Sequence, residues 1–162
     1  MGVAYLFQVG DKIFYPMHGA GVIKAFEDRE IQGKVQKYCI LEIPLNNMDI
    51  MIPMKNLESS GVRKLLDKAT MKEIMDEFRQ SESNEILPWK ERYKTNMEKI
   101  KSGDMQDTAD VVRDLMNQSK EKVLNSSEKQ MLNHAKDFLV SELTLGAGLS
   151  KNQANELLQI SS

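Results

Sequence analysis

The pattern of apolar and polar positions changes character near residue 60. Before it, short apolar runs alternate with turn-forming residues about every 8–12 positions, which is typical of short strands. After it, apolar residues recur at helical spacing and β-branched runs are rare, which is typical of amphipathic helices. We therefore expect an α+β chain with a small β-barrel over residues 1–60 and an all-α helical domain over residues 61–162. We also expect the two to be separate folding units with a modest interface.

The expected strands are short and end at proline, glycine or asparagine. They cover residues 12–15, 22–27, 35–43 and 48–52, with a loop or hairpin tip at 28–34. A barrel of fewer than about 60 residues has a small core, so an enzyme pocket inside it is not expected.

Helices are expected at residues 62–67, 71–80, 89–102, 105–120, 127–145 and 151–160. Their ends carry capping signals. These are Gly103 followed by Asp104, capping-box patterns that begin at Asn125 and at Ser150, and Gly146 and Gly148 after the fifth helix. Residues 80–85 are rich in Ser, Glu and Asn, which predicts a flexible loop before Pro88.

The helix expected at 89–102 carries the only tryptophan of the chain, Trp89, directly after Pro88. At about 100° per residue its side chains separate by kind, with glutamates on the back. The apolar stripe is Trp89, Tyr93, Met97 and Ile100; the flanking cations are Lys90, Lys94 and Lys101 on one side and Arg92 and Lys99 on the other. Two interpretations follow. Trp89 begins a core stripe beside a solvated charged face, or it is a rigidly held indole that stacks on a base while the cations take phosphates.

Composition narrows the choice of partner. The net charge is −2, so the chain has no global basic field, and any nucleic-acid contact must come from a local patch. The single cysteine, Cys39, lies in an apolar run and is expected to be buried. A chain without disulfides, without an apolar run long enough to cross a membrane and without a secretory signal is expected in the cytoplasm.

Enzymatic chemistry finds little support in the sequence. The two histidines, His18 and His134, lie in opposite halves and have no metal-ligand spacing. There is no phosphate-binding glycine loop, nucleophile elbow or paired-carboxylate motif. We therefore expect no catalytic residue, no metal or other cofactor and no small-molecule substrate. A β module joined to a helical module with one aromatic and basic helix is typical of an interaction protein.

Several motifs resemble one family of proteins. They are VGDKIFYP at 9–16 with His18, Gly19 and Gly21, then GVR at 61–63, WxxRYKxN at 89–96, KSGD at 101–104, VVRDL at 111–115 and SEKxML at 127–132, where x is any residue. Together they resemble the CarD/CdnL family of bacterial transcription regulators. The first motif is shared with the transcription-repair coupling factor, which lacks the later ones.

The resemblance implies a function. The first domain would be a Tudor-like barrel that docks on the β subunit of RNA polymerase. The second would contact promoter DNA, without sequence readout, at the upstream edge of the transcription bubble, where its tryptophan enters the minor groove and changes open-complex stability.

The resemblance also implies roles for particular residues. Trp89 would be the wedge; Arg92, Lys94 and Lys129 would contact phosphates, with Lys90 beside them, and Arg29 would contact polymerase together with the 48–52 strand, including Ile50 and Met51. Some members have Arg where this chain has Met51, and a basic residue where it has Glu91. Met51 would then add apolar contact, and Glu91 would weaken phosphate binding.

A second interpretation stays open. The chain could be a protein–protein adaptor whose helical domain binds another protein through Trp89. Salt separates the two, because phosphate contacts weaken steeply with salt and apolar interfaces do not.

Overall fold

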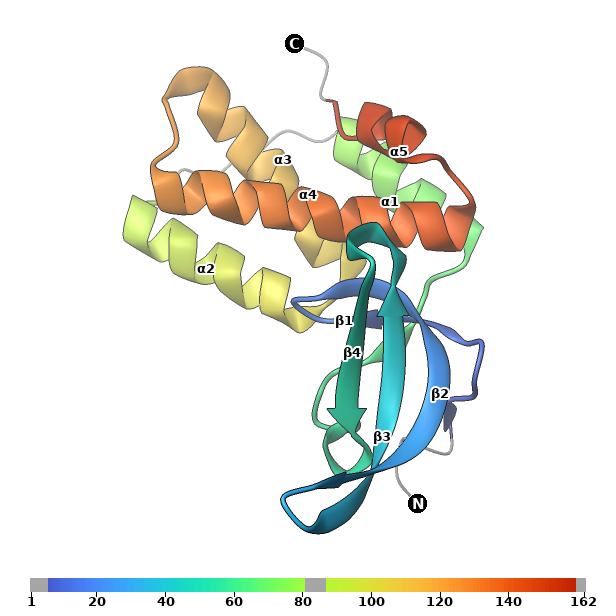
Figure 1. Ribbon diagram of the computed structural model, residues 1–162. Coiled ribbons are helices and arrows are strands. Elements are labelled where there is room, and N and C mark those ends of the chain that lie inside the picture. The colour runs from blue at the N-terminus through green and yellow to red at the C-terminus, as the bar shows by residue number, and fades with distance from the viewer. Residues whose placement is uncertain (1–5, 81–86, 160–162) are drawn as a thin grey trace.

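The computed structural model describes residues 6–80 and 87–159. A long, curved sheet stands below a layer of helices, and the two halves meet along one end of the sheet (Figure 1). The expected loop at 80–85 lies, apart from Gln80, outside the described residues, as does the last residue of the helix expected at 151–160. The α+β class, with strands first and helices after, is confirmed.

The sheet of the described residues is antiparallel and has the strand order β4-β3-β2-β1-β5. Its strands are β1 (Lys12–Tyr15), β2 (Gly19–Ile31), β3 (Lys34–Ile43), β4 (Met48–Pro53) and β5 (Arg63–Lys64). Short 3-10 turns, η2 (Pro44–Asn46) and η3 (Met54–Asn56), flank β4. The strands enclose a small core made of Phe7, Ile13, Ile23, Cys39, Leu41, Ile52 and Leu57.

The hairpin tip expected at 28–34 is narrower than predicted. Strands β2 and β3 continue to Ile31 and from Lys34, so only Gln32 and Gly33 turn. Their φ angles of 53° and 79° are both positive, as a tight two-residue turn with the twist of the flanking strands requires. The result is a long hairpin whose tip extends beyond the end of β4.

The prediction of a helix at residues 62–67 is wrong. Arg63 and Lys64 form strand β5 and pair with Phe14 and Ile13 of β1, and the Leu65 amide donates to the Lys12 carbonyl at 3.2 Å. The edge of β1 would otherwise leave unpaired backbone groups, and this pairing outweighs the local helix preference. The sheet therefore continues to Lys64, past the expected boundary at residue 60.

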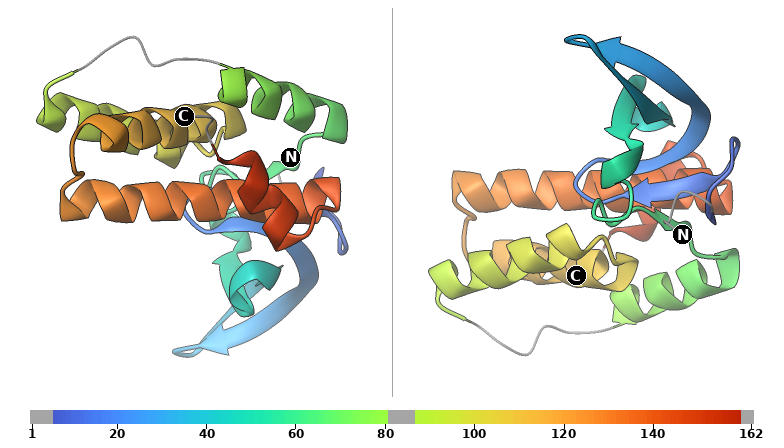
Figure 2. Two further views of the ribbon diagram at one scale, coloured as in Figure 1. Left: turned by 90° about the horizontal axis from the view of Figure 1, so that it is seen from above. Right: turned by 90° about the horizontal axis from the view of Figure 1, so that it is seen from below.

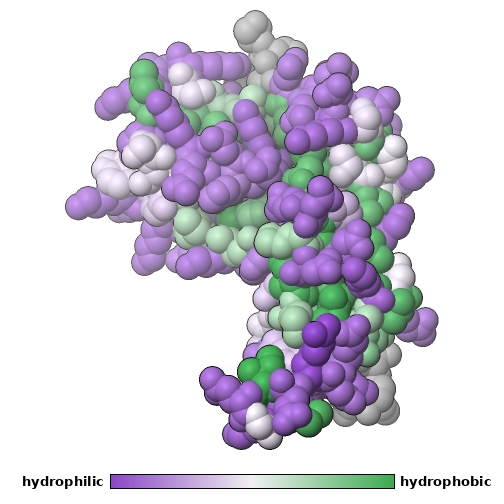
Figure 3. Space-filling view, viewed as in Figure 1, coloured by the Kyte–Doolittle hydropathy of each residue, from purple (hydrophilic) through white to green (hydrophobic). Residues whose placement is uncertain are grey.

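The helical layer contains α1 (Lys68–Gln80), α2 (Trp89–Ser102), α3 (Met105–Glu121), α4 (Ser126–Ala147) and α5 (Lys151–Leu157). Helix α4 lies between the sheet on one side and α1, α2 and α3 on the other (Figure 2). Phe14 and Ala20 of the sheet belong to the large helical core, where the Phe14 ring meets Phe138 of α4 edge-on at 6.2 Å. Hydrophilic residues cover most of the outer helical surface, and apolar residues gather near the junction with the sheet (Figure 3).

Most capping predictions hold. Gly103 ends α2 with a φ of 74°, Asp104 accepts a hydrogen bond from the Gln106 amide, and Ser150 forms a complete capping box with Gln153. At α4 only half of the predicted box forms. Asn125 accepts from the Glu128 amide at 2.9 Å, but the Glu128 carboxylate points instead to α2.

Candidate nucleic-acid interface

Trp89 is the first residue of α2 and is 47% exposed. Pro88 precedes it with a φ of −52°, and the indole meets the Tyr93 ring edge-on at 6.0 Å. Tyr93 and Met97 pack against the large core, and Ile100 is buried. The core interpretation therefore holds for the later residues of the stripe and fails for Trp89. Roughly half of the Trp89 surface is therefore open to a ligand, and the indole keeps one ring contact with Tyr93.

Exposed lysines lie at the same end of the helical layer as this tryptophan. Lys90 and Lys94 follow it on α2, and Lys129 lies in the first turn of α4. The beginnings of α2 and α4 lie at the same end of the helical layer, the end away from the sheet (Figures 1 and 2). The structure thus gathers one aromatic and three exposed cations from separate segments at one end. Glu91 is exposed there as well.

Arg92 differs from these lysines because its charge is already matched. Its Nε and Nη2 donate to the two carboxylate oxygens of Glu128 at 2.8 and 2.9 Å, and Nη1 donates to the Leu87 carbonyl at 3.1 Å. The side chains are 14% and 3% exposed. The hydrogen bond to Glu128 raises the pKa of Arg92, outweighing the burial that lowers it. The expected phosphate contact of Arg92 stays a prediction; in this geometry the guanidinium ties the start of α2 to the start of α4.

An open pocket of about 500 Å³ borders Trp89. Beside the indole, it is lined by Arg92 and Glu128 and by the segment between α3 and α4, including Lys122, Val123 and Leu124. Val123 is 80% exposed, so it adds a second apolar side chain at this end. Sequence periodicity does not predict this contribution, because Val123 lies in the connection between two helices.

The three residues expected to contact polymerase lie on two faces of the sheet. The register pairs Arg29 with Gln36 and Met51 with Ile40. Since side chains alternate along β3, Arg29 and Met51 share a face, roughly 13 Å apart along the strand direction. Ile50 points to the other face and packs against the small core. Arg29 is exposed and already pairs with Glu27, through Nη2 at 2.6 Å.

Both histidines border one pocket of about 260 Å³ between the sheet and α4, which the sequence did not indicate. His18 stacks on Tyr15 at 4.2 Å, and Asp137 and His134 approach from α4. No group of three or more His, Cys, Asp or Glu side chains in residues 6–80 and 87–159 is placed to hold a metal ion.

Cys39 is fully buried in the sheet core, as expected from the sequence. Burial raises the pKa of its thiol to about 11, which disfavours the reactive thiolate. Across the part of the chain that is described, no helix combines the length and apolar character that a membrane crossing needs.

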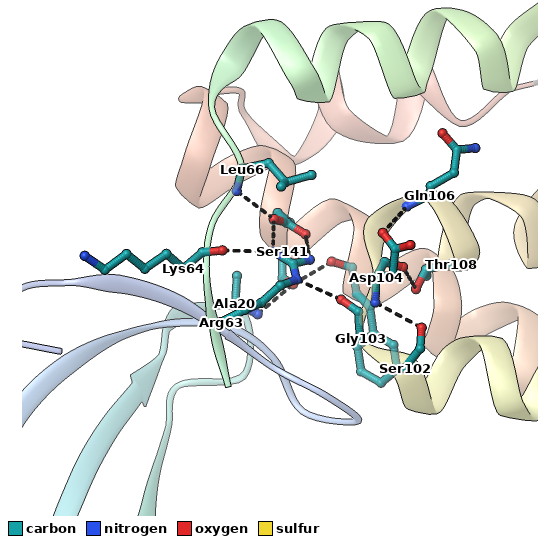
Figure 4. Close-up of polar contacts among 12 residues, drawn as sticks. Ala20, Arg63, Lys64, Leu66, Ser102, Gly103, Asp104, Gln106, Thr108 and Ser141 are labelled. Atoms are coloured by element: carbon teal, nitrogen blue, oxygen red, sulfur yellow. Dashed lines mark hydrogen bonds and ion pairs between the residues drawn. The ribbon is translucent and has the colours of Figure 1, made fainter. Parts of the chain in front are cut away.

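The sequence also missed the polar network at the junction of the two halves (Figure 4). Arg63 of β5 forms a two-point ion pair with Glu142 of α4, at 2.8 and 2.7 Å, and donates from Nε to the Gly103 carbonyl at 2.9 Å. The partners of Arg63 lie 40 and 79 residues away in the chain, beyond any local pattern.

Comparisons with known proteins agree with this architecture. Residues 7–66 match the CarD-like/TRCF RID domain, and residues 73–159 match the family described as CarD, C-terminal domain. The chain is 48% identical over 148 residues to a Bacillus subtilis (strain 168) protein named "Putative transcription factor YdeB", covering 91% of this chain and 97% of that protein.

A solution NMR structure of the 72-residue N-terminal domain of Myxococcus xanthus CarD is 26% identical, with a TM-score of 0.31, over 36% of this chain and 77% of that one. That structural likeness is too low to carry an argument, and the assignment rests on the two domain matches and the curated relative. With both domains matched in order, the chain belongs to the CarD family of transcription factors, which are regulators and not enzymes.

Proposed function

We propose that this CarD-family factor binds the RNA polymerase β subunit through its sheet and promoter DNA through the Trp89 end of its helical layer. It changes the stability of the open complex without reading sequence. The observation that carries the proposal is Trp89 itself, a 47% exposed indole on a fixed first turn with exposed lysines beside it. A buried tryptophan could not fill this role.

The DNA contact is expected at the upstream edge of the bubble. One base pair is already lost there, so an indole that lies against the last step meets a smaller unstacking cost. Lys90, Lys94 and Lys129 lie at the same end of the helical layer and carry no ion pair with another described residue. These cations favour phosphates on any sequence, because a point charge reads no base edge.

The polymerase contact is expected at the edge of the sheet. Strand β4 is an outer strand, so one side of its backbone has N–H and C=O groups available to a partner strand. Met51 is 40% exposed on this strand, and Arg29 lies on the same face. The match of residues 7–66 to the RID domain supports polymerase as the partner.

Replacing Trp89 with Ala tests the proposal. Wedging or stacking contributes on the order of 1–3 kcal/mol, which is roughly five- to a hundredfold in an equilibrium. Open-complex lifetime with Trp89→Ala should fall within that range, while polymerase binding stays unchanged. Because about half of the indole surface is exposed, the unfolding free energy should fall by roughly 1.5–3 kcal/mol, less than the roughly 3–5 kcal/mol that truncation of a core tryptophan costs.

Val123→Ala is the matched control, since it removes another exposed apolar side chain at the same end. It should alter lifetime much less than Trp89→Ala. A lifetime that Trp89→Ala leaves unchanged, with the fold intact, would refute the wedge. The adaptor alternative is separated by salt, since helical-domain binding that hardly responds to salt would favour a protein partner over DNA.

A further inference from the structure

Helix α4 carries two buried glutamates that each hold an arginine from another part of the chain. Glu128 and Glu142 are 2% and 1% exposed. They are 14 residues apart on one continuous helix, which is roughly 21 Å along its axis and about four turns, so they lie on nearly the same side. Glu128 holds Arg92 at the Trp89 end, and Glu142 holds Arg63 at the sheet end.

Arg63 joins four segments at the sheet end, its own strand β5 included. It lies on β5, its guanidinium lies 4.8 Å above the Phe14 ring of β1, and Nε donates to the carbonyl of Gly103 after α2. Both of its terminal nitrogens bond to Glu142 of α4, whose carboxylate also accepts from the Leu66 amide at 3.3 Å. Figure 4 shows these bonds converging at the junction between the sheet and the helices. A planar guanidinium with several fixed partners defines an orientation as well as a distance.

The surrounding surfaces leave little room to slide. A Cβ on Gly103 would lie 2.6 Å from Pro16 Cγ, and one on Gly19 would lie 3.1 Å from Ser141 Oγ. The Ser141 hydroxyl also accepts from the Ala20 amide at 3.0 Å. At the junction, the backbone at Gly103 therefore packs against the Pro16 side chain, and the backbone at Gly19 packs against the Ser141 side chain.

We propose that Arg63 is a positioning residue that locks the sheet onto α4, so that the chain spans its two binding partners as one rigid body with Trp89 at a fixed place relative to strand β4. This inference rests on the proposed function. Once the sheet is docked, a rigid connection holds the indole where the DNA must be. A loose connection spreads it over many positions and lowers its effective concentration there.

The experiment replaces both members of the pair, Arg63→Met with Glu142→Leu. Removing one partner would leave a buried charge unmatched, whereas replacing both by apolar side chains often leaves stability unchanged or higher. The matched control is Arg113→Met with Asp110→Leu, which removes an ion pair that lies within α3 and does not reach the sheet. Asp114, the second partner of Arg113, also lies on α3 and is 26% exposed, so it stays in contact with water in this control. Thermal melting of both variants and of the unaltered chain establishes that all are folded.

Two readouts follow. Spin labels on cysteines introduced at the exposed positions Lys37 and Asn133 report the sheet-to-α4 distance distribution, and buried Cys39 does not compete for label. We expect the distribution to broaden in the Arg63/Glu142 variant and to stay narrow in the control. Open-complex lifetime should fall toward the Trp89→Ala value, by up to the same roughly five- to hundredfold. Affinity for the isolated β segment and for free duplex DNA should not change.

A folded Arg63/Glu142 variant with an unchanged distance distribution and unchanged open-complex lifetime would overturn the proposal. So would an equal loss in the control variant, since the effect would then not depend on the junction. Failure of the proposed function looks different: the unaltered chain would itself leave open-complex lifetime unchanged, whatever the distance distribution shows.

Discussion

At the scale of single residues, the role of an arginine depends on whether its charge is already matched. Lys94 and Lys129 are exposed, so their charges are available to a ligand. Arg92 instead donates its hydrogen bonds to the Glu128 carboxylate and the Leu87 carbonyl. Moving that guanidinium to a phosphate would leave the buried Glu128 carboxylate without its partner, which costs several kcal/mol. The pair is therefore better suited to hold Trp89 and Lys129 in one surface than to contact DNA.

Glu128→Gln tests whether the pair positions Trp89 or competes with DNA for Arg92. The change should affect duplex affinity and open-complex lifetime in different directions. Removing a negative charge near the DNA end should leave affinity for free duplex unchanged or raise it. The same change loosens the start of α2 against the start of α4, so open-complex lifetime should fall by several-fold. Both quantities can be measured on one preparation, below the melting temperature of the variant.

Lys129→Gln, at the neighbouring position, is the comparison for this prediction. It should lower the salt slope of duplex binding by about one unit, as the loss of one phosphate contact does. If Glu128→Gln leaves open-complex lifetime unchanged, the Arg92 pair does not position the wedge. If Arg92→Gln lowers the salt slope as Lys129→Gln does, Arg92 contacts phosphate after all.

At the scale of elements, local signals predicted most of the chain. Helix α2 has its expected bounds because Pro88, Trp89 and Gly103 mark both of its ends within the segment itself. The prediction of a helix at 62–67 was wrong because this segment pairs with strand β1, which lies some 50 residues earlier in the chain. Sequence periodicity reports what a segment can form alone, and β-pairing depends on a distant partner.

The candidate site divides in the same way. Burial of Ile100 follows from the periodicity of one helix, so the sequence indicated it. The helix pattern left open whether Trp89 is core or exposed, and the 47% exposure of the side chain answers that question. The partners of Arg92 and Arg63, and the shared pocket of the histidines, join segments that only folding brings together. The sequence assigned the Glu128 side chain to a capping box with Asn125, so its ion pair with Arg92 was not predicted.

The β4 edge gives a prediction at this scale. Met51→Glu puts a charge on the outward face of an edge strand, where a pairing partner strand would bury it, so affinity for the isolated polymerase β segment should fall at least tenfold. Lys55→Glu, an exposed change just beyond the strand, is the control for charge alone. Equal losses in both would indicate long-range repulsion, and no loss in either would remove β4 from the contact.

At the scale of the whole molecule, α4 unites the two halves. Its first turn carries Glu128 and Lys129, and near its other end Ser141 and Glu142 hold the sheet. Because α4 is one continuous helix between these contacts, no loop separates its two ends. This arrangement explains why Phe14 and Ala20 lie in the helical core although they belong to the sheet.

Cutting the chain between Leu66 and Asp67 tests how independent the halves are. The sheet fragment keeps its own small core and all five strands, so it should fold. It loses the burial of Phe14 and the Arg63 pair, a deficit of roughly 2–3 kcal/mol that should lower its melting temperature by about 10–20 °C. The helical fragment should also melt cooperatively, and mixing the two should raise both transitions. Circular dichroism melts of the two fragments and the full chain measure this independence. If neither fragment folds alone, the chain is one cooperative unit. If both melt like the full chain, the junction contributes nothing to stability and cannot hold the sheet on α4.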